Sequence, residues 1–215
     1  MPDIKYICLS DLHFGAQNSL LTKLTPDGLR PDFLQPSPVL VSLVENLRTI
    51  IAQNQDKSQK PKLILLGDIL ELALCETNEA GMVFDRFIDL ILPEGNELFS
   101  EIYYIPGNHD HHLWEIAREA QYVRYIERMD DKNNLPPMWH TTNIFIENTT
   151  HPTRCDFMNG IIQNNEHLKN FHVQVAYPNF GILNSKGDKS VLFHHGHFLE
   201  DIYTLMSTVK TYIFP

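Results

Sequence analysis

Nine residues from Tyr104 to His112, YIPGNHDHH, place an Asn, an Asp and three His directly after a short apolar run. Asn108 offers an amide oxygen and His109 offers an imidazole nitrogen, and both groups can bind divalent cations. Mixed oxygen and nitrogen ligands suit Mn, Fe, Zn, Co or Ni rather than Ca or Mg alone. The stretch therefore points to a site for such cations and to metal-assisted chemistry.

Three further motifs carry ligands of the same kind, each at the end of an apolar run. SDLH contains Asp11 and His13 two positions apart, so both side chains can face the same side. LLGD ends in Asp68, whose two carboxylate oxygens can bridge two cations. VLFHHGH contains His195. Each motif alone is common, but the ordered set predicts a metal-binding site.

The separated motifs need elements that bring them together. Short apolar runs bounded by turn residues are typical of strands buried on both faces, and such runs occupy residues 4–10, 62–68 and 101–110. The carboxyl ends of parallel strands meet at one edge of a sheet, which is where ligands of α/β proteins gather. The motifs stand at those ends.

Helices are expected between and after these strands. Apolar residues recur at helical spacing over residues 38–51, with Ser37 placed to cap the helix and Pro38 to begin it. Residues 79–92 and 113–129 have similar amphipathic patterns. The resulting β-α-β-α-β-α order predicts an α/β protein with a mainly parallel sheet and right-handed crossovers.

Residues 129–190 differ in character from the rest of the chain. They contain LPP, HPTR, NGIIQNN and NSKGD, with only short strand-like pieces such as NIFIE and HVQVAY. Long irregular stretches in a compact domain are often functional. This part is expected to form a partly β insertion or cap.

D-x-H, G-D, G-N-H-D and a later H-G-H, in this order, resemble the motifs of the calcineurin-like metallophosphoesterases. The resemblance covers residues 1 to about 128 and about 190 to 200. It implies a β-sandwich flanked by helices with a dinuclear metal site inside. Residues 1–215 would then form a single metallophosphoesterase domain with the insertion or cap at about 129–190.

The resemblance also implies a ligand set for two divalent metal ions, with Mn expected and Fe, Zn, Ni or Co as alternatives. Asp11 and His13 would bind the first metal, and Asp68 would bridge both. Asn108 and His195 would bind the second metal.

The activity implied is hydrolysis of a phosphate mono- or diester by a metal-bridging hydroxide. His109 would lie beside the metals without binding them, and would stabilise the transition state or protonate the leaving oxygen. Asp110 would orient the imidazole of His109. These two residues are the expected catalytic side chains.

The chain departs from the family pattern in one place. The superfamily has a final G-H-x-H element that supplies one His to each metal, and none follows His197. In the interpretation that we favour, His195 is a single His at a strand end and the last element lies downstream of Pro215. The chain would then be truncated at its C-terminal end, and weak, partial metal occupancy with low activity or none would be expected. In the other interpretation, His195 and His197 form the H-x-H, and His172 or another His of residues 129–190 takes the earlier role.

The net charge and the cysteine content limit the binding partners and the cell compartment that fit this chain. The 215-residue chain carries a formal net charge of −10, which disfavours long nucleic acids as partners. A small phosphate-ester substrate remains compatible, because bound metals supply positive charge. Three separated cysteines without a CxxC suit a reducing compartment, and no signal peptide or transmembrane segment is visible. A cytoplasmic enzyme is expected.

A non-catalytic protein-interaction module on the same fold is the rival hypothesis. Such modules usually lose metal ligands, and here the ligands and His109 are intact, which favours a metal-dependent phosphoesterase. Nucleases and cyclic-nucleotide phosphodiesterases remain open as subclasses. A pyrophosphohydrolase acting on UDP-diacylglucosamine is disfavoured, because that family carries Arg in the position of His109.

Overall fold

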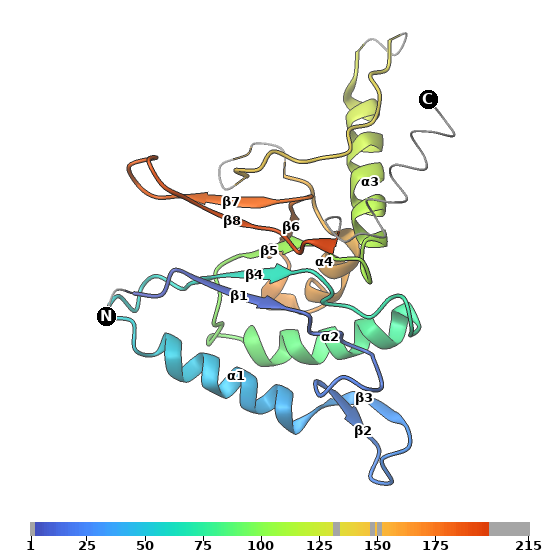
Figure 1. The fold of residues 1–215 in the computed structure, drawn as a ribbon, viewed down its shortest axis with the longest axis vertical. Coiled ribbons are helices and arrows are strands. Elements are labelled where there is room, and N and C mark those ends of the chain that lie inside the picture. The colour runs from blue at the N-terminus through green and yellow to red at the C-terminus, as the bar shows by residue number, and fades with distance from the viewer. Residues whose placement is uncertain (1–2, 131–133, 147–148, 150–151, 198–215) are drawn as a thin grey trace.

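The computed structural model describes residues 3–130, 134–146, 149 and 152–197. A parallel sheet with the strand order β1-β4-β5-β6 forms its centre (Figure 1). Its strands are β1 (Tyr6–Ser10), β4 (Lys62–Leu66), β5 (Ile102–Ile105) and β6 (Val173–Val175). All residues of β5 are buried, as expected for a central strand of a parallel sheet that is covered on both faces.

Helices α1 and α2 lie below the sheet in Figure 1, and α3 stands upright at the right, rising above the level of the sheet. The helices are α1 (Pro38–Ile51), α2 (Thr77–Ile91), α3 (His112–Arg128), α4 (Asp156–Ile162) and a short 3₁₀ turn (Glu166–Leu168). Ser37 caps α1, because its Oγ accepts a hydrogen bond from the Leu40 amide at 3.0 Å. The expected cap of this helix is therefore confirmed.

Two antiparallel hairpins complete the described fold. They are formed by β2 (Thr22–Leu24) with β3 (Pro31–Pro36), and by β7 (Phe180–Leu183) with β8 (Ser190–Phe193). The β7–β8 hairpin lies on the face of the sheet opposite α1 and α2 (Figure 1). A small core joins the two layers, and in it Tyr103 stacks on Phe180 with ring centroids 4.5 Å apart.

Alternation along the strands assigns side chains to the two faces. Leu63 and Leu65 of β4 belong to the large core on the helical side, whereas Ile64 belongs to the small core under the β7–β8 hairpin. A shift of one residue would exchange these faces. The two cores thus fix the register of the central strands and the position at which each strand ends.

The architecture confirms an α/β fold with a parallel central sheet between helices on one face and further strands on the other. The β-α-β-α-β-α order is also confirmed, with the β2–β3 hairpin added between β1 and α1. Residues 143–146, part of the expected NIFIE strand, form no strand. No helix among the described residues is both long enough and apolar enough to cross a membrane.

Residues 129–190, expected to form a partly β insertion or cap, contribute two elements to the described fold. β6 lies within the strand-like piece HVQVAY, and its Val173 pairs with Ile102 of β5 in the main sheet. α4 packs against α2. The division into one domain with an insertion or cap at about 129–190 stays a prediction. The expected truncation at Pro215 concerns residues outside the described part of the chain.

Candidate metal centre

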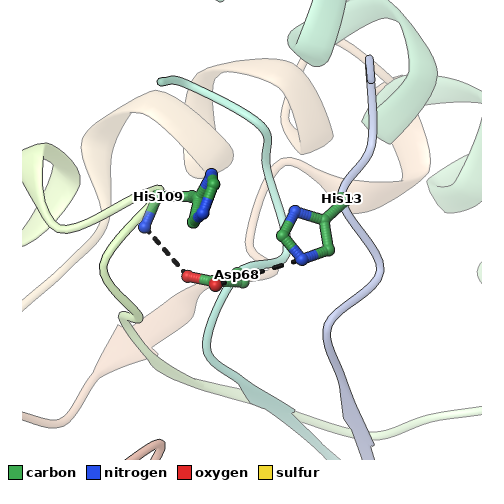
Figure 2. Close-up of side chains that lie close together, drawn as sticks. All are labelled: His13, Asp68 and His109. Atoms are coloured by element: carbon green, nitrogen blue, oxygen red, sulfur yellow. Dashed lines mark hydrogen bonds and ion pairs between the residues drawn. The ribbon is translucent and has the colours of Figure 1, made fainter. Parts of the chain in front are cut away.

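The metal-capable side chains meet at the edge of the sheet where β1, β4 and β5 end. Asp11 follows β1 directly, Asp68 lies two residues beyond β4, and His109 stands in the loop between β5 and α3. Figure 2 shows the imidazoles of His13 and His109 on either side of Asp68. Parallel pairing of the three strands brings these segments together, although they are far apart in the sequence.

The backbone of the site is unusual at three of its residues. Asp11, His13 and Asp68 have φ angles of 55°, 45° and 52°, in the left-handed region that residues other than glycine rarely adopt. Backbone bonds hold this conformation, from the Asp11 amide to the Gly67 carbonyl at 3.1 Å and from the His13 amide to the Asp68 carbonyl at 2.9 Å. Strain of this kind clusters at functional sites.

Asp68 is the centre of the arrangement and is only 4% exposed. Its Oδ1 accepts a hydrogen bond from the His109 amide at 2.9 Å. Among the described residues, two groups offer ligand atoms within 4.8 Å of one another, one formed by His13, Asp68 and His109 and the other by Asp11, Asp68 and His195. One buried carboxylate is therefore shared by two candidate ligand groups.

His195 reaches the site from the loop after β8. Its Nε2 lies 3.6 Å from Asp11 Oδ1 and 3.7 Å from Asp68 Oδ2. Its Nδ1 lies 3.3 Å from Nδ1 of the buried His197. Burial, reinforced by the neighbouring His195 and His111, lowers the pKa of His197 to about 4. His197 is thus a neutral neighbour behind His195 at pH 7.

His172 occupies a different part of the fold. It directly precedes β6, at the amino end of that strand, and its ring contacts Arg154 and Gln163. The site lies at the carboxyl ends of the strands. The interpretation that placed His172 in the metal centre therefore disagrees with its position, although a role for His195 does not.

Glu71 is a site residue that motif reasoning did not identify. Its carboxylate is 2% exposed and accepts from Nδ1 of His13 at 2.8 Å and from Nδ1 of His109 at 2.7 Å. Burial opposes its ionisation, but the hydrogen bonds from His109 and His13 outweigh burial and lower the pKa of Glu71. The same contact with Glu71 is the main cause that raises the pKa of His109.

The expected role of Asp110 in orienting His109 stays a prediction, and both of its carboxylate oxygens accept hydrogen bonds from backbone amides. Its Oδ2 accepts from the amides of Ile69 at 2.8 Å and Leu70 at 3.3 Å, and its Oδ1 accepts from the amide of Gly107 at 2.7 Å. Burial raises the pKa of Asp110 in spite of these bonds. Asp110 therefore ties the loop after β4 to the loop after β5, whereas Glu71 makes the hydrogen bond that orients His109.

The donor set suits divalent cations. Two carboxylates and three imidazoles converge, and Asn108 stands exposed beside them in the loop after β5. Carboxylate and imidazole ligands together favour Mn, Fe, Co, Ni or Zn. The carboxylate of Glu71 also supplies the hydrogen bond to Nδ1 that metal-binding imidazoles almost always have.

Gly67 gives His195 the space that it occupies, so we expect Gly67→Ala to disturb the site. A Cβ at this position would collide with the imidazole of His195, and Gly67 has a φ of 68°. Left-handed strain costs about 1–2 kcal/mol, and overpacking typically adds about 1–3 kcal/mol. Denaturant unfolding should show a loss of several kcal/mol, and metal titration should show weaker binding.

Gly95→Ala is the matched control, because Gly95 has a φ of 73° and no atom within 4 Å of an added Cβ. Gly95→Ala should lower the free energy of unfolding only by the cost of the left-handed backbone, and it should leave metal binding unchanged. Equal effects of the two substitutions would mean that the contact with His195 is unimportant.

Comparisons with known proteins give the family. A family model described as calcineurin-like phosphoesterase matches residues 4–213. No curated protein and no solved structure matched the chain. The matched region includes every described strand and helix, and the superfamily consists of metal-dependent phosphoesterases. The chain belongs to the calcineurin-like phosphoesterase family.

Proposed function

We propose that this protein hydrolyses a phosphate mono- or diester with the help of two divalent cations. The observation that carries the proposal is the sharing of Asp68 between two groups of ligand-capable atoms. In these groups His13 stands with His109 and Asp11 stands with His195. The proposed sites follow the family resemblance instead, in which Asp11 and His13 would complete one cation site. Asn108 and His195 would complete the other.

The cations, when bound, supply Lewis acidity for the phosphate oxygens and for the attacking water. The protein's own contribution comes from His109, which Glu71 holds by a hydrogen bond at 2.7 Å. Because this contact raises the pKa of His109, the imidazole keeps a proton to a higher pH than an ordinary His. His109 can then protonate the leaving oxygen as its bond to phosphorus breaks.

The net charge of the chain supports a small substrate. The chemistry of the ligand atoms supports Mn as the metal. A net charge of −10 disfavours a long polyanion, whereas one phosphate group can be attracted by the cations alone. The mixed oxygen and nitrogen donors suit Mn, with Fe, Zn, Co and Ni as alternatives. The free state of Cys8, Cys75 and Cys155 supports a reducing compartment, and we propose the cytoplasm.

The proposal is tested with chain that has been stripped of metal by a chelator and then titrated with Mn²⁺. We expect two ions per chain by elemental analysis. We also expect hydrolysis of p-nitrophenyl phosphate or bis(p-nitrophenyl) phosphate that appears with Mn²⁺ and disappears with chelator. The two substrates separate monoesterase from diesterase activity.

Two results would contradict the proposal. A chain that binds two ions but hydrolyses neither ester would support the non-catalytic interaction module. A chain that binds no ion would remove the metal centre itself.

A further inference from the structure

His111 is an imidazole at the candidate metal centre that the proposed mechanism does not use. It stands two residues after His109, in the loop that joins β5 to α3. Two residues of chain span at most about 7 Å, so the backbone of His111 lies beside the site. Its side chain is 34% exposed. An ester whose phosphate occupies the site would therefore bring its organic group close to this ring.

A row of three imidazoles connects His111 to the candidate ligand His195. The ring centroids of His195 and His197 are 5.5 Å apart, and those of His197 and His111 are 6.2 Å apart, with planes at 75°. The middle ring, His197, is buried. The row therefore runs from the candidate ligands toward the amino end of α3 and ends in a partly exposed ring.

Tyr177 brings an aromatic ring to the same region from the fourth strand of the sheet. It lies two residues beyond β6, as Asp68 lies two residues beyond β4, so both stand at the carboxyl edge of the parallel sheet. The rings of Tyr177 and His111 meet edge to face, with centroids 5.1 Å apart and planes at 73°. At this edge β6 thus contributes an aromatic side chain, where the other three strands contribute metal-capable groups.

Further contacts hold these rings in place. Tyr177 stacks on the buried Trp114 with ring centroids 5.1 Å apart. The Tyr177 amide donates to Oγ1 of Thr142 at 2.9 Å, and the Tyr177 carbonyl accepts from the Thr142 amide at 2.8 Å. His111 thus contacts one ring that is anchored by Trp114 and Thr142 and another, His197, that is buried. A ring fixed in this way loses little freedom when it binds a ligand, which favours affinity.

A partly exposed and fixed ring beside a phosphate site suits a ligand that carries another planar ring. Planar rings pair in offset-stacked or edge-to-face geometry at centroid distances of about 4.5–7 Å. The rings around His111 already adopt such geometry with one another. An aliphatic group could also touch His111, but its contact would lack the electrostatic attraction between ring quadrupoles.

We propose that His111 binds the organic group of the substrate, and that this group carries a planar unsaturated ring, such as a phenyl group or a nucleobase. The inference rests on the proposed function, because the phosphate of the same ester would be held by the cations. His111 would determine which ester is bound and would take no part in proton transfer. Tyr177 would position His111.

Binding of phosphonates tests the proposal without catalysis, because their carbon–phosphorus bond takes the place of the ester bond that the reaction would break. The Mn²⁺-loaded chain is titrated in a calorimeter with methylphosphonate, phenylphosphonate and an acyclic adenine nucleoside phosphonate. We expect at least one of the two ring-bearing ligands to bind more tightly than methylphosphonate. Comparison of these two ligands separates a ring directly on phosphorus from a ring beyond a spacer.

His111→Ala should reduce this preference about 2–10-fold, the factor that one aromatic contact contributes. Mn²⁺ content and methylphosphonate affinity should stay unchanged, because His111 belongs to neither candidate ligand group. His111→Phe should retain the preference, because it keeps a planar ring. His112→Ala removes the exposed neighbouring imidazole, and as the matched control it should behave like the native chain.

The native chain and both variants can each overturn the proposal. A native chain that prefers neither ring-bearing phosphonate would do so, even if a variant fails to fold. An unchanged preference in a folded His111→Ala would show that the contact lies elsewhere. A preference lost in His111→Phe as well would show that the contact is not made between rings.

These readouts separate the role of His111 from the proposed function. Phosphonate binding that depends on the His111 ring, in a chain that hydrolyses no phosphate ester, would support the inference and contradict the proposed activity. Ester hydrolysis with a ring preference that does not depend on His111 would do the reverse. A chain that binds no Mn²⁺ would contradict the proposed function and this inference together.

Discussion

Asp68→Asn is expected to deplete both metal sites at once and to abolish most of the turnover. The substitution keeps the shape of the side chain but removes its charge and one of its oxygens. Asp68 belongs to both candidate ligand groups, and its Oδ2 lies 4.0 Å from His13 Nε2 and 3.7 Å from His195 Nε2. Loss of a shared ligand should weaken metal binding by more than the factor of about 10–100 that is typical when a hydrogen-bond partner of a metal ligand is lost.

Elemental analysis after dialysis measures this effect for each variant. Asn108→Ala should mainly reduce the second metal and thereby distinguish a single ligand from a bridging one. Asp188→Asn, in the exposed turn between β7 and β8, makes the same chemical change away from the site and should retain both ions. Full metal content in Asp68→Asn would remove the bridging assignment.

His109→Ala is expected to keep the metals and lose about 10²–10³-fold in turnover, the usual cost of removing one donor to the transition state. The expectation follows from its contacts, since Nδ1 is occupied by Glu71 and the amide donates to Asp68. The side chain would thus act on substrate through the opposite ring nitrogen. Parallel assays of metal content and of aryl phosphate hydrolysis measure the two effects.

His112→Ala is the control for this prediction, because His112 is an exposed neighbour at the start of α3. It should leave both quantities unchanged. His109 also lies close enough to His13 and Asp68 to be a ligand. Equal losses of metal and rate in His109→Ala would identify it as one.

The proximity of the metal-capable side chains could be predicted because it follows from a simple rule. Asp11, Asp68 and His109 each come after a short apolar run, and parallel strands bring their carboxyl ends to one edge. His195 was harder to place, because β8 belongs to a separate hairpin. The β2–β3 hairpin was not predicted. β6 lies within the strand-like piece HVQVAY and β8 within the apolar run before HHGH, but the strands with which they pair were not predicted, because pieces of three or four residues have too little periodicity to show where they pack.

Glu71 is a contact of His109 that motif reasoning did not identify. Asp110 stands beside His109 in the sequence, and its carboxylate accepts hydrogen bonds from backbone amides of two loops. Glu71 lies three residues after Asp68 in the otherwise apolar stretch ILELAL. A carboxylate in such a stretch must be paired if it is buried. That signal was present, but its two partners come from other loops, which only the tertiary structure identifies.

The left-handed backbone at Asp11, His13 and Asp68 lowers the stability of the fold at residues that the candidate site needs. Each such residue can cost up to about 1–2 kcal/mol relative to an ordinary conformation. The three together approach a considerable part of the roughly 5–15 kcal/mol by which domains are stable. Glycine would relieve the strain at any of these positions, but it would remove a candidate ligand. Selection for a more stable chain and selection for a competent site therefore act in opposite directions here.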